Sequence, residues 1–262
     1  MRAAERLSAV VAVLMLAASF AGLLAEGLYR DNLLVRSGWL GNDLVTLLVV
    51  TPALMAALLL ARSGSLRARL LWLGLLAYAF YNYAFYLFGS AYNALFLVYV
   101  AILTGSAFAL AFGLSNLDAP SVAARFHPGA PVKRVSAYVL LVSTMLGGFW
   151  IAIYVESLMN GRPPAMLETT GGTTNLIAAL DLSMVVSVGA LSGWWLWRRR
   201  AWGYVLATVW NVKSAAYMLA LSAASVTSWR AGAVGDVSQI ALWAPIGIGC
   251  TVASFILLRS CR

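Results

Sequence analysis

The chain has 262 residues, of which 62% are hydrophobic and only 10% are charged, and its formal net charge is +9. An ordinary soluble domain is about 45–50% apolar and about 25% charged. So much apolar surface cannot be buried inside one water-soluble globule, which excludes a disordered chain, a coiled coil, a disulfide-rich secreted domain and a soluble nucleic-acid-binding protein. The composition predicts an all-α polytopic membrane protein.

Eight apolar stretches are long enough to cross a bilayer, because a hydrocarbon core of about 30 Å requires roughly 20 helical residues. In chain order they are 8–29, 40–61, 69–88, 93–115, 136–158, 175–197, 201–224 and 237–258. A polar segment from Asn116 to Arg134 separates the fourth stretch from the fifth. We therefore expect eight transmembrane helices, both termini on one side, and little structure outside the membrane.

The basic residues predict the orientation of these helices. With the N-terminus inside, the inner segments hold Arg2, Arg6, Arg62, Arg67, Arg69, Arg125, Lys133, Arg134, Arg198, Arg199, Arg200, Arg259 and Arg262. The outer segments hold only Arg30, Arg36, Arg162 and Arg230. This asymmetry follows the positive-inside rule and predicts that both termini are cytoplasmic. We expect the inner (plasma) membrane of the cell, with the basic face in contact with anionic lipids.

Polar residues recur in the same order in the two halves of the chain, which predicts a tandem duplication of four helices. The matching pairs are Glu26 with Glu156, Asp43 with Asp181, and Asn82 with Asn211. Because four is an even number, the two halves would be parallel repeats related by an axis along the membrane normal. We expect the first repeat over residues 1–128 and the second over residues 129–262.

Lys213 is the charged residue that breaks this correspondence, because the first half has Ala84 at the matching position. A lysine near the middle of a bilayer costs at least about 2.5 kcal/mol on insertion scales and normally faces a partner or a wet cavity. The sixth and seventh spans are joined by a short turn, so Asp181 lies at a depth compatible with an ion pair to Lys213. Such a pair either binds a solute or ion or is a structural link. A Schiff-base lysine holding a pigment fits eight spans poorly.

The other acidic residues each have a functional and a structural interpretation. Asp43 either lines an outward vestibule together with Asp181 or caps the second helix, and capping is favoured for Asp43. Asp181 has Asn175 upstream as a better cap. Asp236 is expected to cap the eighth helix. Glu26 and Glu156 close their helices, where the helix dipole disfavours a negative charge, so each is either functional or simply solvated.

The third span carries tyrosines and an asparagine that lie too deep for the aromatic belt at the membrane surface. Tyr78 and Asn82 share one helical face and Tyr81 lies beside them, which is compatible with an aromatic wall around a ligand. The full set of expected substrate-binding residues is Asp181, Lys213, Asn211, Asn82, Asp43, Glu156, Glu26, Tyr78 and Tyr81.

No cofactor or metal is expected. The chain has a single histidine, His127, and its two cysteines, Cys250 and Cys261, form no CxxC motif, which disfavours haem, zinc and thiol redox centres. Phosphate-loop and nucleophile-elbow motifs are absent.

We expect a transporter or permease that binds a small solute or ion in an outward-facing polar cavity between the repeats. Two alternatives stay open. One is a non-catalytic binder, sensor or assembly subunit, as a homo-oligomer or with a partner membrane subunit. The other, an enzyme acting on a lipid or quinone, is less favoured because such enzymes often use histidines. No nucleic-acid partner is expected.

Overall fold

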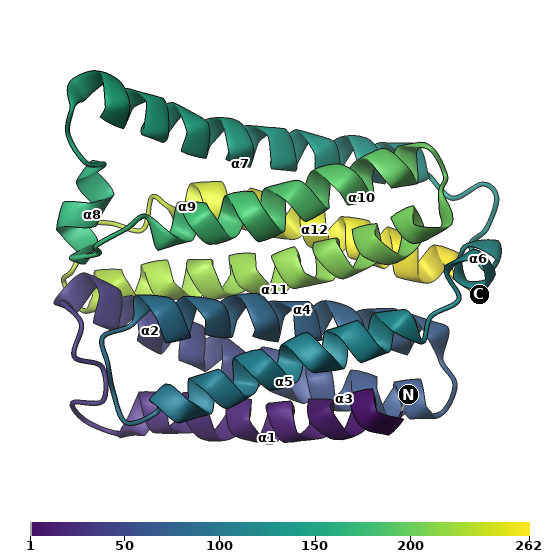
Figure 1. The fold of residues 1–262 in the computed structure, drawn as a ribbon, viewed down its shortest axis with the longest axis horizontal. Coiled ribbons are helices and arrows are strands. Elements are labelled where there is room, and N and C mark those ends of the chain that lie inside the picture. Colours follow the sequence, from purple (N-terminus) through teal and green to yellow (C-terminus); the bar gives the residue numbers. More distant parts are fainter. Residues whose placement is uncertain (1) are drawn as a thin grey trace.

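The computed structural model describes residues 2–262, and every long element in that range is a helix (Figure 1). The first half contains α1 (Arg2–Leu24), α2 (Leu33–Val45), η1 (Thr46–Val50), α3 (Thr51–Arg62), α4 (Leu66–Gly89), α5 (Phe96–Ser115) and α6 (Ala119–Ala124). The second half contains α7 (Val132–Asn160), α8 (Ala165–Thr170), α9 (Leu176–Leu180), η2 (Asp181–Val186), α10 (Ser187–Trp197), α11 (Ala201–Arg230) and α12 (Ile240–Ser260). The elements η1 and η2 are π-helical segments within two longer continuous helices, α2–η1–α3 and α9–η2–α10.

Seven helices within residues 2–262 are long and apolar enough to cross a membrane. They are Arg2–Leu24, Leu33–Arg62, Leu66–Gly89, Phe96–Ser115, Val132–Asn160, Leu176–Trp197 and Ile240–Ser260. This confirms the expectation of a multi-pass helical membrane protein. The stretch 201–224 lies within α11, which is a helix of 30 residues but is too polar to meet the same criterion.

The position of α11 explains its lower hydropathy. It runs through the middle of the bundle, between the helices of the first half and α10 and α12 of the second (Figure 1). Its neighbours include α2, α4, α10 and α12, so most of its surface faces protein and little of it needs to be compatible with lipid. Both chain ends lie at the same end of the bundle as α6 (Figure 1).

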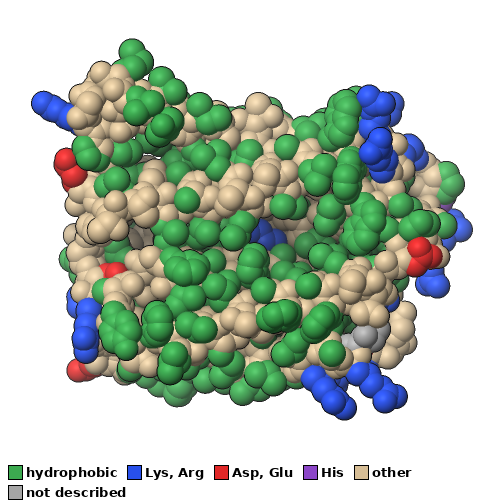
Figure 2. All heavy atoms as spheres, in the orientation of Figure 1, with side chains coloured by type: hydrophobic (Ala, Val, Ile, Leu, Met, Phe, Trp, Pro, Cys, Tyr) green, Lys and Arg blue, Asp and Glu red, His purple; other side chains and the backbone are tan. Residues whose placement is uncertain are grey.

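Apolar side chains cover the long face of the bundle, and Lys and Arg gather at its two ends (Figure 2). One basic side chain is recessed near the middle of this face (Figure 2). The most exposed apolar side chains include Leu97, Leu158 and Met159, at 75%, 64% and 82%. A soluble protein rarely exposes such a large continuous apolar surface, and a bilayer accounts for it.

Three predicted helix ends are resolved by their capping contacts. As expected, Asn175 caps the helix that begins with α9 at Leu176, because its Oδ1 accepts a hydrogen bond from the amide of Ala178 at 3.1 Å. Capping by Asp43 was a wrong expectation. Asn32 caps the continuous helix that begins with α2 at Leu33, and Asp43 lies about three turns further along it. A buried face with several polar residues made the beginning of this helix resemble a loop in the sequence.

Asp236 accepts a hydrogen bond from the amide of Ser238 at 2.8 Å, before α12 begins at Ile240. It therefore caps the turn that leads into α12. The expectation that it caps the helix itself was wrong. The side-chain and backbone hydrogen bonds from Ser238 lower the pKa of Asp236.

Small residues allow the central helices to approach closely, as is common in membrane proteins. An ideal Cβ on Gly41 of α2 would lie 2.4 Å from the backbone nitrogen of Ala224 in α11. One on Gly74 of α4 would lie 2.4 Å from Cβ of Val212 in the same helix. Two helices of the first half therefore pack directly on α11.

A buried hydrogen bond between α1 and α4 gives a first stability prediction. The indole N–H of Trp72 donates to Oγ of Ser8 at 3.0 Å, and both side chains have no exposed surface. Ser8→Ala leaves this N–H without an acceptor, and we expect a loss of about 1–3 kcal/mol. Thermal unfolding in detergent measures it, with the exposed Ser121→Ala as the control. Equal stability of the two variants would contradict the prediction.

Candidate functional site

Asp181 lies where three helices from both halves of the chain meet. It is the first residue of η2, and its side chain is buried. Oδ1 accepts a hydrogen bond from the hydroxyl of Tyr81 in α4 at 2.6 Å, and Oδ2 accepts one from the indole N–H of Trp150 in α7 at 2.9 Å. Two of the expected site residues, Asp181 and Tyr81, are thus in direct contact.

The ammonium group of Lys213 rests on aromatic rings in the interior of the bundle. Lys213 is 7% exposed. Its Nζ lies 3.6 Å from the ring centroid of Tyr81 and 5.0 Å from that of Tyr217. These two rings meet edge to face, with centroids 4.7 Å apart. Cation–π attraction to both rings stabilises the charge.

The expected ion pair between Asp181 and Lys213 is absent. A salt bridge joins Arg62 and Glu5, with N and O atoms 3.4 Å apart, but none joins Lys213 and Asp181. Tyr81 explains the absence, because its hydroxyl donates to Asp181 while its ring contacts Lys213. The two charges therefore share one tyrosine and form no salt bridge, and the Asp181 carboxylate attracts the Lys213 ammonium only at longer range.

A second polar group includes Asn82 and Tyr78 of α4. Asn42 of α2 donates through Nδ2 to Oδ1 of Asn82 at 2.8 Å, and it accepts at Oδ1 from the hydroxyl of Tyr78 at 2.9 Å. The Tyr78 hydroxyl also lies 2.8 Å from Oγ1 of Thr46. Asn42 and Thr46 were not expected from the sequence. Their spacing of four residues, which places two polar side chains on one face of an apolar helix, is the signal that could have found them.

Asp43 lies in a separate cluster of tyrosines. Its Oδ2 accepts from the hydroxyl of Tyr29 at 2.5 Å, and its Oδ1 accepts from the hydroxyl of Tyr86 at 2.9 Å. The carboxyl is 2% exposed. Tyr29 and Tyr86 were not among the expected site residues.

Three expected site residues are not part of these clusters. Asn211 donates through Nδ2 to the carbonyl of Ala207 in its own helix at 2.7 Å. Glu26 and Glu156 are exposed, in the turn after α1 and near the end of α7 respectively. The structure therefore brings together Asp181, Tyr81 and Lys213, and separately Tyr78 and Asn82.

Two cavities lie at opposite ends of the bundle. One, of about 360 Å³, is lined by residues that follow the end of α1, together with Tyr29, Arg36 and Leu40. The other, of about 370 Å³, is at the end where the chain termini lie, between the segment after α6 and the C-terminus. Neither is lined by Asp181 or Lys213, so the expected outward cavity at these residues is not seen in either of them.

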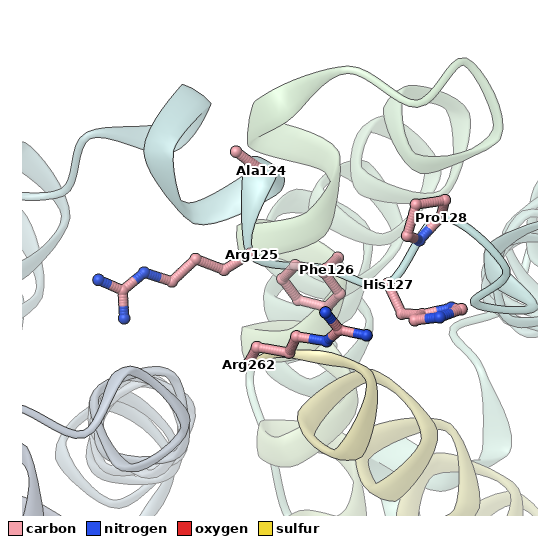
Figure 3. A pocket seen from close by; sticks show the side chains of 6 residues that line it. All are labelled: Ala124, Arg125, Phe126, His127, Pro128 and Arg262. Atoms are coloured by element: carbon pink, nitrogen blue, oxygen red, sulfur yellow. The ribbon is translucent and has the colours of Figure 1, made fainter.

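Figure 3 shows the cavity near the C-terminus, where the Arg262 side chain points toward His127 and Arg125 points away. Backbone hydrogen bonds fix this arrangement, from His127 to the carbonyl of Ser260 at 2.8 Å and from Arg262 to the carbonyl of Arg125 at 2.9 Å. His127 is exposed and lies in a polar loop, as its sequence context indicated. No group of three metal-binding side chains is present among residues 2–262.

Comparison of the chain with protein-family models, with curated proteins and with solved structures found no match. The function is therefore argued from the geometry of the buried polar residues.

Proposed function

We propose that this chain is a permease-like membrane transporter whose solute-binding centre is formed by Lys213, Asp181 and Tyr81. The observation that carries the proposal is the burial of the Lys213 ammonium without a salt bridge. Its ammonium is buried and has no carboxylate oxygen within 4.0 Å in the described part of the chain. A charge held at this depth without a salt bridge is costly, and such residues typically mark solute or ion pathways.

The electrostatics favour a small solute that carries an anionic group. Both carboxylate oxygens of Asp181 accept hydrogen bonds, from Tyr81 and Trp150, and Asp181 forms no salt bridge that would occupy the ammonium. The rings of Tyr81 and Tyr217 contact Lys213 and offer an apolar surface for the body of a solute. A carboxylate is an anionic group that one ammonium with hydroxyl-bearing neighbours can bind through charge-assisted hydrogen bonds.

Unsatisfied polar atoms in α4 and α11, the helices that carry Tyr81 and Lys213, support binding of a polar ligand or water. Nδ2 of Asn82, Oδ1 of Asn211 and Oγ of Ser214 are buried and have no hydrogen-bond partner. Asn82 adjoins Tyr81, and Ser214 adjoins Lys213 in the sequence. Buried polar atoms of this kind are normally satisfied by protein, water or a ligand.

In this proposal the chain crosses the membrane eight times, with α11 as the eighth span and both termini on the basic, cytoplasmic side. Two parallel repeats, 1–128 and 129–262, form the bundle. The repeats are supported by a feature that both halves share, an aspartate at or just before a π-helical segment. Asp43 precedes η1, and Asp181 is the first residue of η2. π-Helical turns are frequent at functional sites. The buried centre corresponds to a closed state, and opening toward the outer side creates the polar cavity.

Ligand identification tests the proposal. The protein is purified in lipid nanodiscs, co-purified small molecules are identified by mass spectrometry, and thermal shifts are recorded with small carboxylic acids. The amide of each acid is the matched control ligand, since it keeps the shape and loses the charge. We expect acids to raise the melting temperature and their amides to have no effect. Equal stabilisation by acid and amide would contradict an anion-binding centre at Lys213.

A further inference from the structure

The tyrosine cluster around Asp43 holds a buried carboxyl that solute binding at Lys213 does not use. The two hydroxyl donors, Tyr29 and Tyr86, come from the segment after α1 and from α4. No Lys, Arg or His nitrogen lies within 4.0 Å of this carboxyl among residues 2–262. An ionised carboxylate buried without a cation is strongly disfavoured, whereas the protonated form carries no net charge.

Two further hydroxyls in this region lack partners. Oγ of Ser19 in α1 and the hydroxyl of Tyr99 in α5 are buried without a hydrogen bond. Ser19 lies one turn before Gly22, whose ideal Cβ would be 2.0 Å from Oδ2 of Asp43, so the two residues share the face of α1 that meets the carboxyl. The ring of Tyr99 lies 5.2 Å from that of Tyr86. The carboxyl thus has further hydroxyl groups beside it to which its protonated form can bond.

The cavity of about 360 Å³ reaches this cluster from the end of the bundle opposite the chain termini. Tyr29 and Gly22 both line it. The hydroxyl of Tyr29 bonds Asp43, and Gly22 lies against the same carboxylate oxygen. Tyr29 and Gly22 therefore lie between the carboxyl and the cavity.

We propose that Asp43 is a proton-binding site, loaded from this cavity through the hydroxyl of Tyr29. A hydronium ion in the cavity gives a proton to the Tyr29 oxygen, and the Tyr29 hydroxyl proton passes to Oδ2 of Asp43. The products are a neutral carboxylic acid, an unchanged tyrosine and a water molecule. The site lies in the first half of the chain and is independent of the solute centre at Lys213.

The packing favours a proton over a metal cation. The position that a Cβ of Gly22 would occupy is already filled by Oδ2 of Asp43 and the Tyr29 hydroxyl, at 2.0 and 2.5 Å. A metal cation with several oxygen ligands at 2.3–2.6 Å, such as Ca²⁺, requires more space and more acceptors than this cluster gives. Both known partners of the carboxylate are hydroxyl donors, which suits a group that gains and loses a proton.

The titratable and charged groups around Asp43 come from several elements. The tyrosines are Tyr29 from the loop, Tyr78, Tyr83 and Tyr86 from α4, and Tyr99 from α5. The charged groups are Asp31 in the loop, Glu26 in the turn after α1 and Arg36 in α2. Burial and the adjacent Asp43 carboxylate raise the pKa of Tyr29. The Tyr29 hydroxyl therefore keeps its proton at neutral pH and remains a donor to the carboxylate.

Infrared spectroscopy of the protein in nanodiscs tests this proposal without a solute. We expect the carbonyl band of a protonated carboxyl to appear as the pH is lowered, to be absent from Asp43→Asn and to persist in the exposed control Asp236→Asn. A band that persists unchanged in Asp43→Asn would overturn the proposal. A band in the wild type that disappears when sodium is added at constant pH would instead identify a cation site, and would also overturn it.

Tyr29→Phe keeps the carboxyl and provides a second test if Asp43→Asn does not fold. The variant removes the hydroxyl between the cavity and Oδ2. We expect the band to respond to a rapid pH change at least about 10-fold more slowly than in the wild type, and its midpoint pH to shift because one donor to the carboxylate is lost. Unchanged kinetics and an unchanged midpoint would exclude Tyr29 as the route.

Discussion

Gly41→Ala is expected to lower the thermal stability of the bundle strongly. The added methyl group would meet backbone atoms of Ala223 and Ala224 in α11 at 2.4–2.5 Å, and a backbone cannot rotate away as a side chain can. Overpacking of this kind costs about 1–3 kcal/mol and occasionally more. Because α11 contacts helices of both halves, separating α2 from it would weaken the whole bundle.

Gly38→Ala is the matched control, one turn earlier in the same helix. Nothing lies within 4 Å of its ideal Cβ. Alanine is favoured over glycine inside a helix by about 1 kcal/mol, so this variant should melt at or above the wild-type temperature. Thermal unfolding of both variants in the same detergent gives the comparison. If the melting temperature of Gly41→Ala is as high as that of Gly38→Ala, the close approach of α2 and α11 is wrong.

Lys213→Met is expected to weaken solute binding by about 30-fold or more while making the protein slightly more stable. Placing a lysine at the centre of a membrane helix costs about 2.5–3.5 kcal/mol, and a desolvated cation–π contact returns about 2 kcal/mol. Methionine keeps the length of the side chain and removes the charge, so we expect a gain of about 1 kcal/mol. Loss of a buried charged contact to a ligand costs about 2 kcal/mol or more, which is about 30-fold in Kd.

Lys133→Met is the control for this substitution. Lys133 also lies over an aromatic ring, with Nζ 5.6 Å from the centroid of Trp197, but it is exposed near the beginning of α7. We expect neither binding nor stability to change. Isothermal titration with the acid found by the thermal-shift screen measures binding to both variants. Wild-type affinity in Lys213→Met would show that the ammonium does not bind the solute.

The class of the protein was predictable from composition, but the position of each helix in the bundle was not. Hydropathy identified the stretch 201–224 as a span like the others. Packing instead places α11 at the centre of the bundle, where helices from both halves surround it. Hydropathy reports how apolar a segment is and contains no information on which neighbours cover it.

The meeting of Asp181 and Lys213 at one tyrosine was only partly predictable. Helix order and depth indicated that the two charges lie near each other, since the sixth and seventh spans are antiparallel neighbours. Depth does not give the rotation of α4 about its axis, which places Tyr81 in contact with both charges. The tyrosine cluster of Asp43 was missed because its donors, Tyr29 and Tyr86, are far apart in the sequence.

Solute uptake into proteoliposomes tests the central claim most directly. Wild-type protein, Lys213→Met and Lys133→Met are reconstituted at equal density, and uptake of the radiolabelled acid is measured against protein-free liposomes. A transporter with its binding centre at Lys213 predicts similar uptake rates for wild type and Lys133→Met. It also predicts that uptake by Lys213→Met stays at the level of protein-free liposomes. Uptake by Lys213→Met at the wild-type rate would contradict it.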